Sequence, residues 1–150
     1  MFNPDYKDLL RLFTEHGVEY VVVGAYAMAA HGVVRATGDI DLFVRPTVDN
    51  ASAVFDALVE FGAPLAEITA DDFAVAGTVY QIGVVPSRID ILTEIDGVSW
   101  NQVGSVMLHV DDLPVPFLNL ESLKRNKAST GRAKDRLDLE LLRETDSPEP

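Results

Sequence analysis

Two aspartates interrupt a segment that otherwise has the composition of a buried β-strand. Residues 38–44 read Gly-Asp-Ile-Asp-Leu-Phe-Val, with Asp39 and Asp41 two positions apart. Because side chains on a strand alternate between faces, both carboxylates point to one side while Ile40 and Leu42 point into a core on the other. Ionised carboxylates on one face repel each other, and without a cation the pKa of one rises. A divalent cation such as Mg²⁺, which prefers hard oxygen ligands, resolves this conflict. An edge strand with one solvated face is the alternative.

The charge balance restricts what the protein binds. The 150-residue chain has 24 acidic and 12 basic side chains, a formal net charge of −12, which disfavours indiscriminate binding to nucleic acid or anionic lipid. Six bases nevertheless fall within thirteen residues that contain a single acid. This cluster is either a solvated helix face or a local phosphate site. Its members are Lys124, Arg125, Lys127, Arg132, Lys134 and Arg136.

Other features of the composition favour a cytoplasmic location. The chain contains no cysteine, which suits a reducing compartment. The first residues, MFNPDYKD, lack the basic and apolar regions of a signal peptide. The longest nearly apolar run, residues 20–30, is about half the ~20 residues that a membrane span needs. We therefore expect a cytoplasmic protein with no membrane partner.

The order of helix and strand patterns predicts one α/β (α+β) domain over residues 1–144, followed by a disordered tail over 145–150. Alternating and β-branched runs indicate a mixed sheet of about five or six strands flanked by helices. Thr47 is expected to cap one helix and Gly62 to end it. Helices are predicted over 3–16, 25–31, 48–61, 120–127 and 132–143. Strands are predicted over 18–23, 38–44 and 87–92, in a hairpin of 106–110 with 115–118, and as a strand pair or bent strand over 73–85.

Three further residues strengthen the interpretation of Asp39 and Asp41 as a site. Gly24 lies where a strand turns into a helix, so that the backbone can approach a ligand closely. Asp90 is a third acid within an apolar strand, a costly position unless the carboxylate is paired or metal-bound. Arg35 precedes the pair by four residues and is near enough to meet a phosphate. Each feature has a structural alternative: an ordinary turn, an outward-facing strand residue and a surface arginine.

The combination resembles the nucleotidyltransferase superfamily, whose relatives include DNA polymerase β. A glycine turn opening a helix, an Asp-x-Asp strand and a later acidic strand residue carry the resemblance. Two longer blocks resemble more closely the abortive-infection (AbiEii-like) nucleotidyltransferases, prokaryotic proteins that are often toxins of toxin–antitoxin pairs. The resemblance covers roughly residues 5–143. Its blocks are Gly24…His31-Gly…Arg35-Ala-Thr-Gly-Asp39-Ile-Asp41-Leu and Lys127…Gly131-Arg132-Ala-Lys134-Asp135…Asp138-Leu.

The resemblance implies magnesium-dependent transfer of a nucleoside monophosphate from a nucleoside triphosphate, such as ATP, to an acceptor hydroxyl. The acceptor would belong to tRNA, a protein or a small molecule, and a cognate antitoxin would be a partner. Two Mg²⁺ ions, or Mn²⁺ in their place, would bind the catalytic residues Asp39, Asp41 and Asp90. Asp135 would orient the basic residue before it. The nucleotide would contact Gly24, Ala25, Arg35, Lys127, Arg132 and Lys134.

One position departs from the superfamily pattern. Ala25 stands where a serine hydroxyl or a second glycine usually follows the glycine of the turn, so one phosphate contact is missing. A catalytically degenerate relative that binds a nucleotide or a partner is therefore an alternative. A metal-dependent nuclease would also use clustered aspartates, although it has no need of the glycine turn. Retention of three costly carboxylates favours the transferase.

Overall fold

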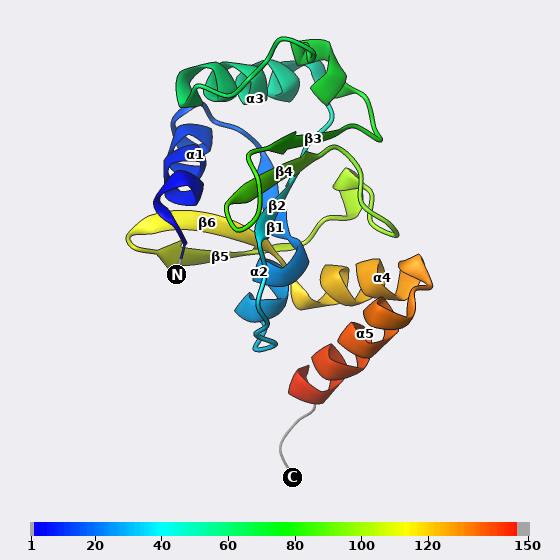
Figure 1. The fold of residues 1–150 in the computed structure, drawn as a ribbon. Helices are drawn as coiled ribbons and strands as arrows, with labels where there is room; N and C mark the ends of the chain where they lie inside the picture. Colours follow the sequence, from blue (N-terminus) through cyan, green and yellow to red (C-terminus); the bar gives the residue numbers. More distant parts are fainter. Residues whose placement is uncertain (1, 147–150) are drawn as a thin grey trace.

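The computed structural model describes residues 2–146, and within them helices and strands alternate along the chain (Figure 1). The elements are α1 (Pro4–Glu15), β1 (Tyr20–Val23), α2 (Gly24–Ala30), β2 (Asp39–Val44), α3 (Val48–Phe61), the 3-10 helix η1 (Ala70–Ala74), β3 (Val79–Ile82), β4 (Arg88–Leu92), the 3-10 helix η2 (Trp100–Gln102), β5 (Ser105–Val110), β6 (Leu113–Leu118), α4 (Leu120–Thr130) and α5 (Ala133–Asp146). None of the helices in this part of the chain is both long and apolar enough to cross a membrane.

The strands within residues 2–146 form one mixed sheet of six strands in the order β3-β4-β2-β1-β6-β5. β2 and β4 are parallel, as are β1 and β6, and the other neighbouring pairs are antiparallel. β2 is an interior strand, so the edge-strand alternative for its two aspartates is wrong. The sheet confirms the predicted α/β fold with a mixed sheet of about five or six strands flanked by helices.

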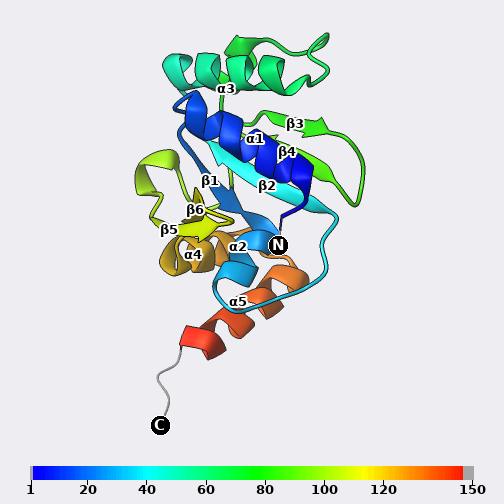
Figure 2. The same cartoon turned by 90° about the vertical axis from the view of Figure 1, so that its left-hand side faces the viewer.

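Helices cover both faces of the sheet, and each face has its own apolar core (Figure 2). One core joins α1 and α3 to sheet residues that include Ile40 and Leu42. The other joins α2, α4 and α5 to the opposite face, around Phe43. Alternation along β2 therefore directs Asp39 and Asp41 toward the side of α2 and the C-terminal helices, as the pattern predicted.

Local capping explains where α1 begins and where α3 begins and ends. The side chain of Asn3 accepts a hydrogen bond from the backbone N–H of Tyr6, and Thr47 does the same for Asn50. α3 ends at Gly62, whose φ of 87° lies in the left-handed region that glycine tolerates. The prediction of a helix over 48–61 between Thr47 and Gly62 is confirmed.

The segment 73–85 differs from its prediction. It contains only one strand, β3, and Phe73 lies in the 3-10 helix η1 instead. Thr69 and Asp72 form a capping box, in which the Thr69 backbone N–H donates to Asp72 Oδ2 at 2.8 Å and starts the helical turn. This local bond outweighs the strand composition of the apolar residues that follow.

Two other boundaries also differ. The hairpin turn comprises only Asp111 and Asp112, whose positive φ values of 51° and 68° suit a two-residue loop, so the strand resumes at Leu113. Thr145 and Asp146 belong to α5 rather than to the expected tail, and residues 147–150 of that tail lie outside the described residues.

Candidate active site

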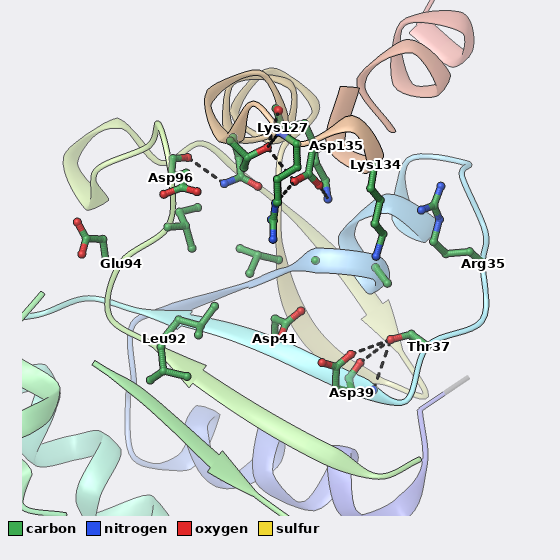
Figure 3. A pocket seen from close by; sticks show the side chains of 18 of the residues that line it. Arg35, Thr37, Asp39, Asp41, Leu92, Glu94, Asp96, Lys127, Lys134 and Asp135 are labelled. Carbon is green, nitrogen blue, oxygen red and sulfur yellow. Dashed lines mark hydrogen bonds and ion pairs between the residues drawn. The ribbon is translucent and has the colours of Figure 1, made fainter. Parts of the chain in front are cut away.

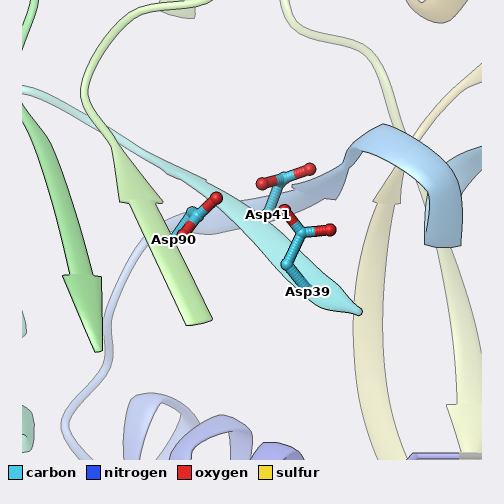
Figure 4. A group of neighbouring side chains, drawn as sticks. All are labelled: Asp39, Asp41 and Asp90. Atoms are coloured by element: carbon cyan, nitrogen blue, oxygen red, sulfur yellow. The ribbon is translucent and has the colours of Figure 1, made fainter. Parts of the chain in front are cut away.

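Three carboxylates meet where β2 and β4 lie side by side. Their parallel register pairs Asp41 with Asp90 and Asp39 with Arg88. Each of the three aspartates offers one oxygen, and these oxygens lie within 4.8 Å of one another (Figure 4). The sequence prediction that Asp90 would converge with the Asp39–Asp41 pair therefore agrees with the geometry. Asp90 is buried, with 6% of its surface exposed, so the cluster is not a solvated acidic patch.

Arg88 is the cation in contact with this cluster. Its Nη2 donates to Asp39 Oδ2 at 2.6 Å and to Asp90 Oδ2 at 3.1 Å, and its Nε donates to Asp90 Oδ1 at 2.9 Å. Thr37 completes the set, since its hydroxyl donates to Asp39 Oδ1 at 2.9 Å. Sequence reasoning did not single out Arg88 as a site residue and so missed its contact with Asp39.

The crowding of three carboxylates destabilises the ionised form of Asp41. Burial and then the nearby charges of Asp39 and Asp90 raise the pKa of Asp41 from 3.8 to about 7, against the opposing charge of Arg88. An elevated pKa from burial among like charges marks a carboxylate that gains from a cation. The expectation that one carboxylate of a metal-free pair would have a raised pKa agrees with this direction.

Gly24 brings the backbone of β1 and α2 against Asp41. Its φ of 67° is in the left-handed region, and a Cβ atom there would lie only 2.2 Å from Asp41 Oδ2. A larger residue at this position therefore collides with the carboxylate. Ala25 follows in the first turn of α2 and lines the same cleft as Gly24 and Asp41.

The cleft above the carboxylates has a volume of about 630 Å³ (Figure 3). Asp39 and Asp41 lie on its floor, between a side that carries Arg35 and Lys134 and a side that carries acidic residues. The predicted basic residues Arg35, Lys127, Arg132 and Lys134 all line it. The cleft residues that sequence reasoning did not single out include Thr37, Glu94, Asp96, Asn126 and Thr130.

Asp135 holds two of the basic residues at the cleft. It is 2% exposed and accepts from Lys127 Nζ at 3.1 Å, Arg132 Nε at 2.7 Å and Thr130 Oγ1 at 2.8 Å. Burial alone would raise the pKa of Asp135, yet these donors outweigh it and hold the pKa below the usual value. The expectation that Asp135 orients the adjacent Lys134 is wrong, because its partners are Lys127 and Arg132. Lys134 has no ion-pair partner within residues 2–146.

Asp138 is a second buried anchor that sequence reasoning named in a motif but did not treat as a site residue. It is 1% exposed and lies 2.6 Å from Arg35 Nη2 and 3.1 Å from Lys127 Nζ. The spacing from Asp135 is the signal that was available, since residues three apart share a helix face. Asp138 thereby ties α5 to the segment before β2.

The donor set fits a hard divalent cation. Three carboxylates offer oxygen ligands, which Mg²⁺ prefers, and two of them, Asp39 and Asp41, line a cleft with room for water and phosphate oxygens. Two-metal sites hold their ions about 3.5–4 Å apart, a spacing that suits oxygens within 4.8 Å of one another. Asp39, Asp41 and Asp90 are thus the residues that would hold a metal.

Comparison with solved structures identifies the fold. TM1012 of Thermotoga maritima, provisionally assigned as a nucleotidyltransferase, superposes with a TM-score of 0.63 over 96% of both chains at 18% identity. The fold is that of the nucleotidyltransferases. The antibiotic-resistance factor ANT(2'')-Ia matches with a TM-score of 0.62 over 95% of this chain and 83% of its own at 12% identity. The lincosamide antibiotic adenylyltransferase LnuA, solved with lincomycin bound, matches with a TM-score of 0.58 over 97% and 98% at 13% identity.

Sequence comparison is less informative. No protein-family profile and no curated protein sequence matches the chain. The nucleotidyltransferase fold expected from the sequence is borne out, whereas the nearer resemblance to AbiEii-like proteins remains a sequence prediction.

Proposed function

We propose that this chain is a metal-dependent nucleotidyltransferase, which moves a nucleoside monophosphate from a nucleoside triphosphate such as ATP to an acceptor hydroxyl. One observation carries the proposal. Asp39, Asp41 and Asp90 converge, and the first two of them line, with Gly24, a cleft that four basic side chains also line. The nucleotidyltransferase fold of the chain supports it.

Two Mg²⁺ ions, or Mn²⁺ in their place, are the cofactors that the carboxylates suit. When bound, such ions neutralise the phosphates and activate the attacking oxygen in an in-line displacement. Asp39 and Asp41 would bind both ions, and Asp90 would complete the ligand set on the acceptor side. These assignments follow the superfamily pattern on residues that this chain brings together.

The side chains of the cleft then have distinct tasks. Arg35, Lys127, Arg132 and Lys134 would bind and orient the triphosphate, since positioning and electrostatics supply most of the acceleration in such transfers. The turn at Gly24 lets phosphate oxygens approach the backbone. The acceptor oxygen bonds to the α-phosphorus, the bond to the β-phosphate oxygen breaks, and pyrophosphate leaves. The hydroxyl proton passes to the carboxylate of Asp90.

The acceptor hydroxyl is proposed to belong to tRNA, a protein or a small molecule. LnuA, one of the similar structures, is an adenylyltransferase that binds lincomycin, and this favours a small molecule. A role as the toxin of a toxin–antitoxin pair in the cytoplasm, with an antitoxin as partner, rests on the AbiEii-like resemblance alone.

Transfer of label from α-labelled nucleotides tests the proposal. The chain is incubated with each nucleotide, Mg²⁺ and a cell extract, and the labelled product identifies donor and acceptor together. Asp39→Asn should abolish labelling, while Asp56→Asn, an exposed aspartate on α3, should leave it unchanged. Equal labelling by wild type and Asp39→Asn would refute the proposed site.

Ala25 favours one rival, a degenerate relative that binds a nucleotide without transferring it. That rival predicts saturable nucleotide binding in the presence of Mg²⁺ and no labelled product with any nucleotide or extract. The transferase predicts both binding and product.

A further inference from the structure

Arg88 places a positive charge in direct contact with two of the three clustered carboxylates. It stands directly opposite Asp39 in the parallel register of β2 and β4, two residues before Asp90 on its own strand. From there one guanidinium reaches both carboxylates, with contacts of 2.6 Å to Asp39 and of 2.9 and 3.1 Å to the two oxygens of Asp90.

The three carboxylates differ in how many of their oxygens already accept hydrogen bonds. Both oxygens of Asp90 accept hydrogen bonds from Arg88. Both oxygens of Asp39 also have donors, Thr37 on Oδ1 and Arg88 on Oδ2. Asp41 receives no hydrogen bond from the guanidinium, although the oxygens of the three aspartates cluster within 4.8 Å. A metal ion bound to Asp90 would therefore share its oxygens with the positively charged guanidinium.

We propose that Arg88 is a built-in counter-cation, which holds Asp39 and Asp90 together while the site is free of metal and is displaced when a divalent cation binds there. The inference rests on the metal site of the proposed function. Arginine cannot yield by losing its proton, because a guanidinium stays charged in proteins. The guanidinium must therefore move away from the carboxylates when a metal ion binds. It can move into solvent, because 31% of the Arg88 side chain is exposed.

The guanidinium of Arg88 and a divalent metal ion therefore compete for the same carboxylate oxygens. Arg88 stabilises the metal-free protein by neutralising part of the charge of three crowded carboxylates, and it weakens metal binding to the same extent. Its removal should therefore have opposite effects on the stability of the metal-free protein and on its affinity for metal. A purely structural arginine would not produce this pair of effects.

Arg88→Gln tests the competition, with Mn²⁺ as the probe because its free form is counted by electron paramagnetic resonance. We expect the variant to bind Mn²⁺ about tenfold more tightly than wild type, since charged hydrogen bonds of this kind oppose binding only in wild type. Arg88→Lys, which keeps the charge but not the two-pronged contact, should fall between them. Arg45→Gln is the matched control, because it removes the same charge from a surface pair with Glu19 at the far end of β2.

Thermal unfolding provides a readout independent of affinity. Without metal Arg88→Gln should melt below wild type, and with saturating Mn²⁺ the difference should shrink or reverse, whereas Arg45→Gln should show the same small difference in both conditions. If wild type binds Mn²⁺ and Arg88→Gln and Arg88→Lys bind it no more tightly, Arg88 is not a competitor and this inference fails alone. If none of the proteins binds Mn²⁺, the metal site of the proposed function fails as well.

Discussion

Gly24 and Asp41 are fitted to each other so closely that the carboxylate fills the place of a side chain at the glycine. A Cβ atom on Gly24 would lie 2.2 Å from Asp41 Oδ2 and 3.1 Å from its Cγ. The contact arises because β1 and β2 are antiparallel neighbours in which Val23 pairs with Asp41. The turn into α2 and the carboxylate cluster are therefore one structural unit, and a change at the turn must move the carboxylate.

Gly24→Ala should lower both stability and metal affinity. The positive φ of 67° costs a residue with a Cβ roughly 1–2 kcal/mol, and the collision with Asp41 adds to this loss. Gly62→Ala is the control, because its φ is 87° but nothing lies within 4 Å of a Cβ there. Urea unfolding and Mn²⁺ titration of both variants separate the two contributions. Equal stability losses with unchanged Mn²⁺ affinity would show that Asp41 adjusts freely.

Asp41→Asn should stabilise the metal-free protein at neutral pH while abolishing transfer. The pKa of Asp41 is raised from 3.8 to about 7, so between those pH values the folded protein keeps a proton that the unfolded chain releases. The free energy of unfolding of wild type therefore falls by at most roughly 4 kcal/mol as pH rises through this window, and it levels off above it. The Asp41→Asn variant does not show this loss of stability, because asparagine has no proton to release.

The measurement is urea unfolding in a chelator at about pH 4, 5.5 and 7.5. The advantage of Asp41→Asn over wild type should grow across the series, while Asp56→Asn, which alters an exposed acid on α3, should show no such trend. A variant that is less stable than wild type at pH 7.5 would mean that Asp41 is held by a favourable contact rather than strained by its neighbours.

Asp138→Asn should weaken both the fold and nucleotide binding. The residue is 1% exposed and lies 2.6 Å from Arg35 and 3.1 Å from Lys127, so its loss leaves Arg35 without its buried partner and Lys127 with Asp135 alone. Removing one member of a buried pair costs about 3 kcal/mol, and the affinity for nucleotide should fall because both bases line the cleft.

Glu121→Gln is the control for this change. It breaks a surface pair with Arg125, whose members are 3.3 Å apart, and such pairs contribute about 0.5 kcal/mol. Chemical unfolding and nucleotide titration report the two effects. If Asp138→Asn unfolds at the same urea concentration as Glu121→Gln, the buried network does not stabilise the protein.

The sequence predicted those parts of the site that depend on local pattern. Alternation along β2 placed Asp39 and Asp41 on one face, because the two-residue period of a strand leaves no other choice. The capping residues Thr47 and Gly62 were also sufficient to predict the ends of α3, because each acts within one turn of the helix.

The parts that the sequence did not predict depend on contacts between distant segments. Arg88 meets Asp39 only because β2 and β4 are in a particular register, and no pattern within either strand specifies that register. Asp138 reads as a surface acid on an amphipathic helix, and its burial follows from the packing of α5 near Arg35. Both residues are charged partners of predicted site residues, a relationship that becomes visible only in the folded chain.

Ala25→Ser should tighten nucleotide binding if the phosphates lie over the turn at Gly24. The alanine lines the cleft in the first turn of α2, so a hydroxyl would add one donor to a site already bordered by backbone. One net hydrogen bond contributes roughly 0.5–1.5 kcal/mol, or up to about 3 when the acceptor is charged. The exchange costs the helix only a few tenths of a kcal/mol by propensity, so the gain should not be masked.

Titration calorimetry with nucleotide and Mg²⁺ measures the effect, and Ala29→Ser provides the control. Ala29 is half-buried in the same helix but is not part of the cleft, so its serine variant should change helix propensity without changing affinity. A gain confined to Ala25→Ser places the phosphates at the turn. If affinity is unchanged or lower, the phosphates are held elsewhere, and the basic residues from Lys127 to Lys134 become the principal phosphate contacts.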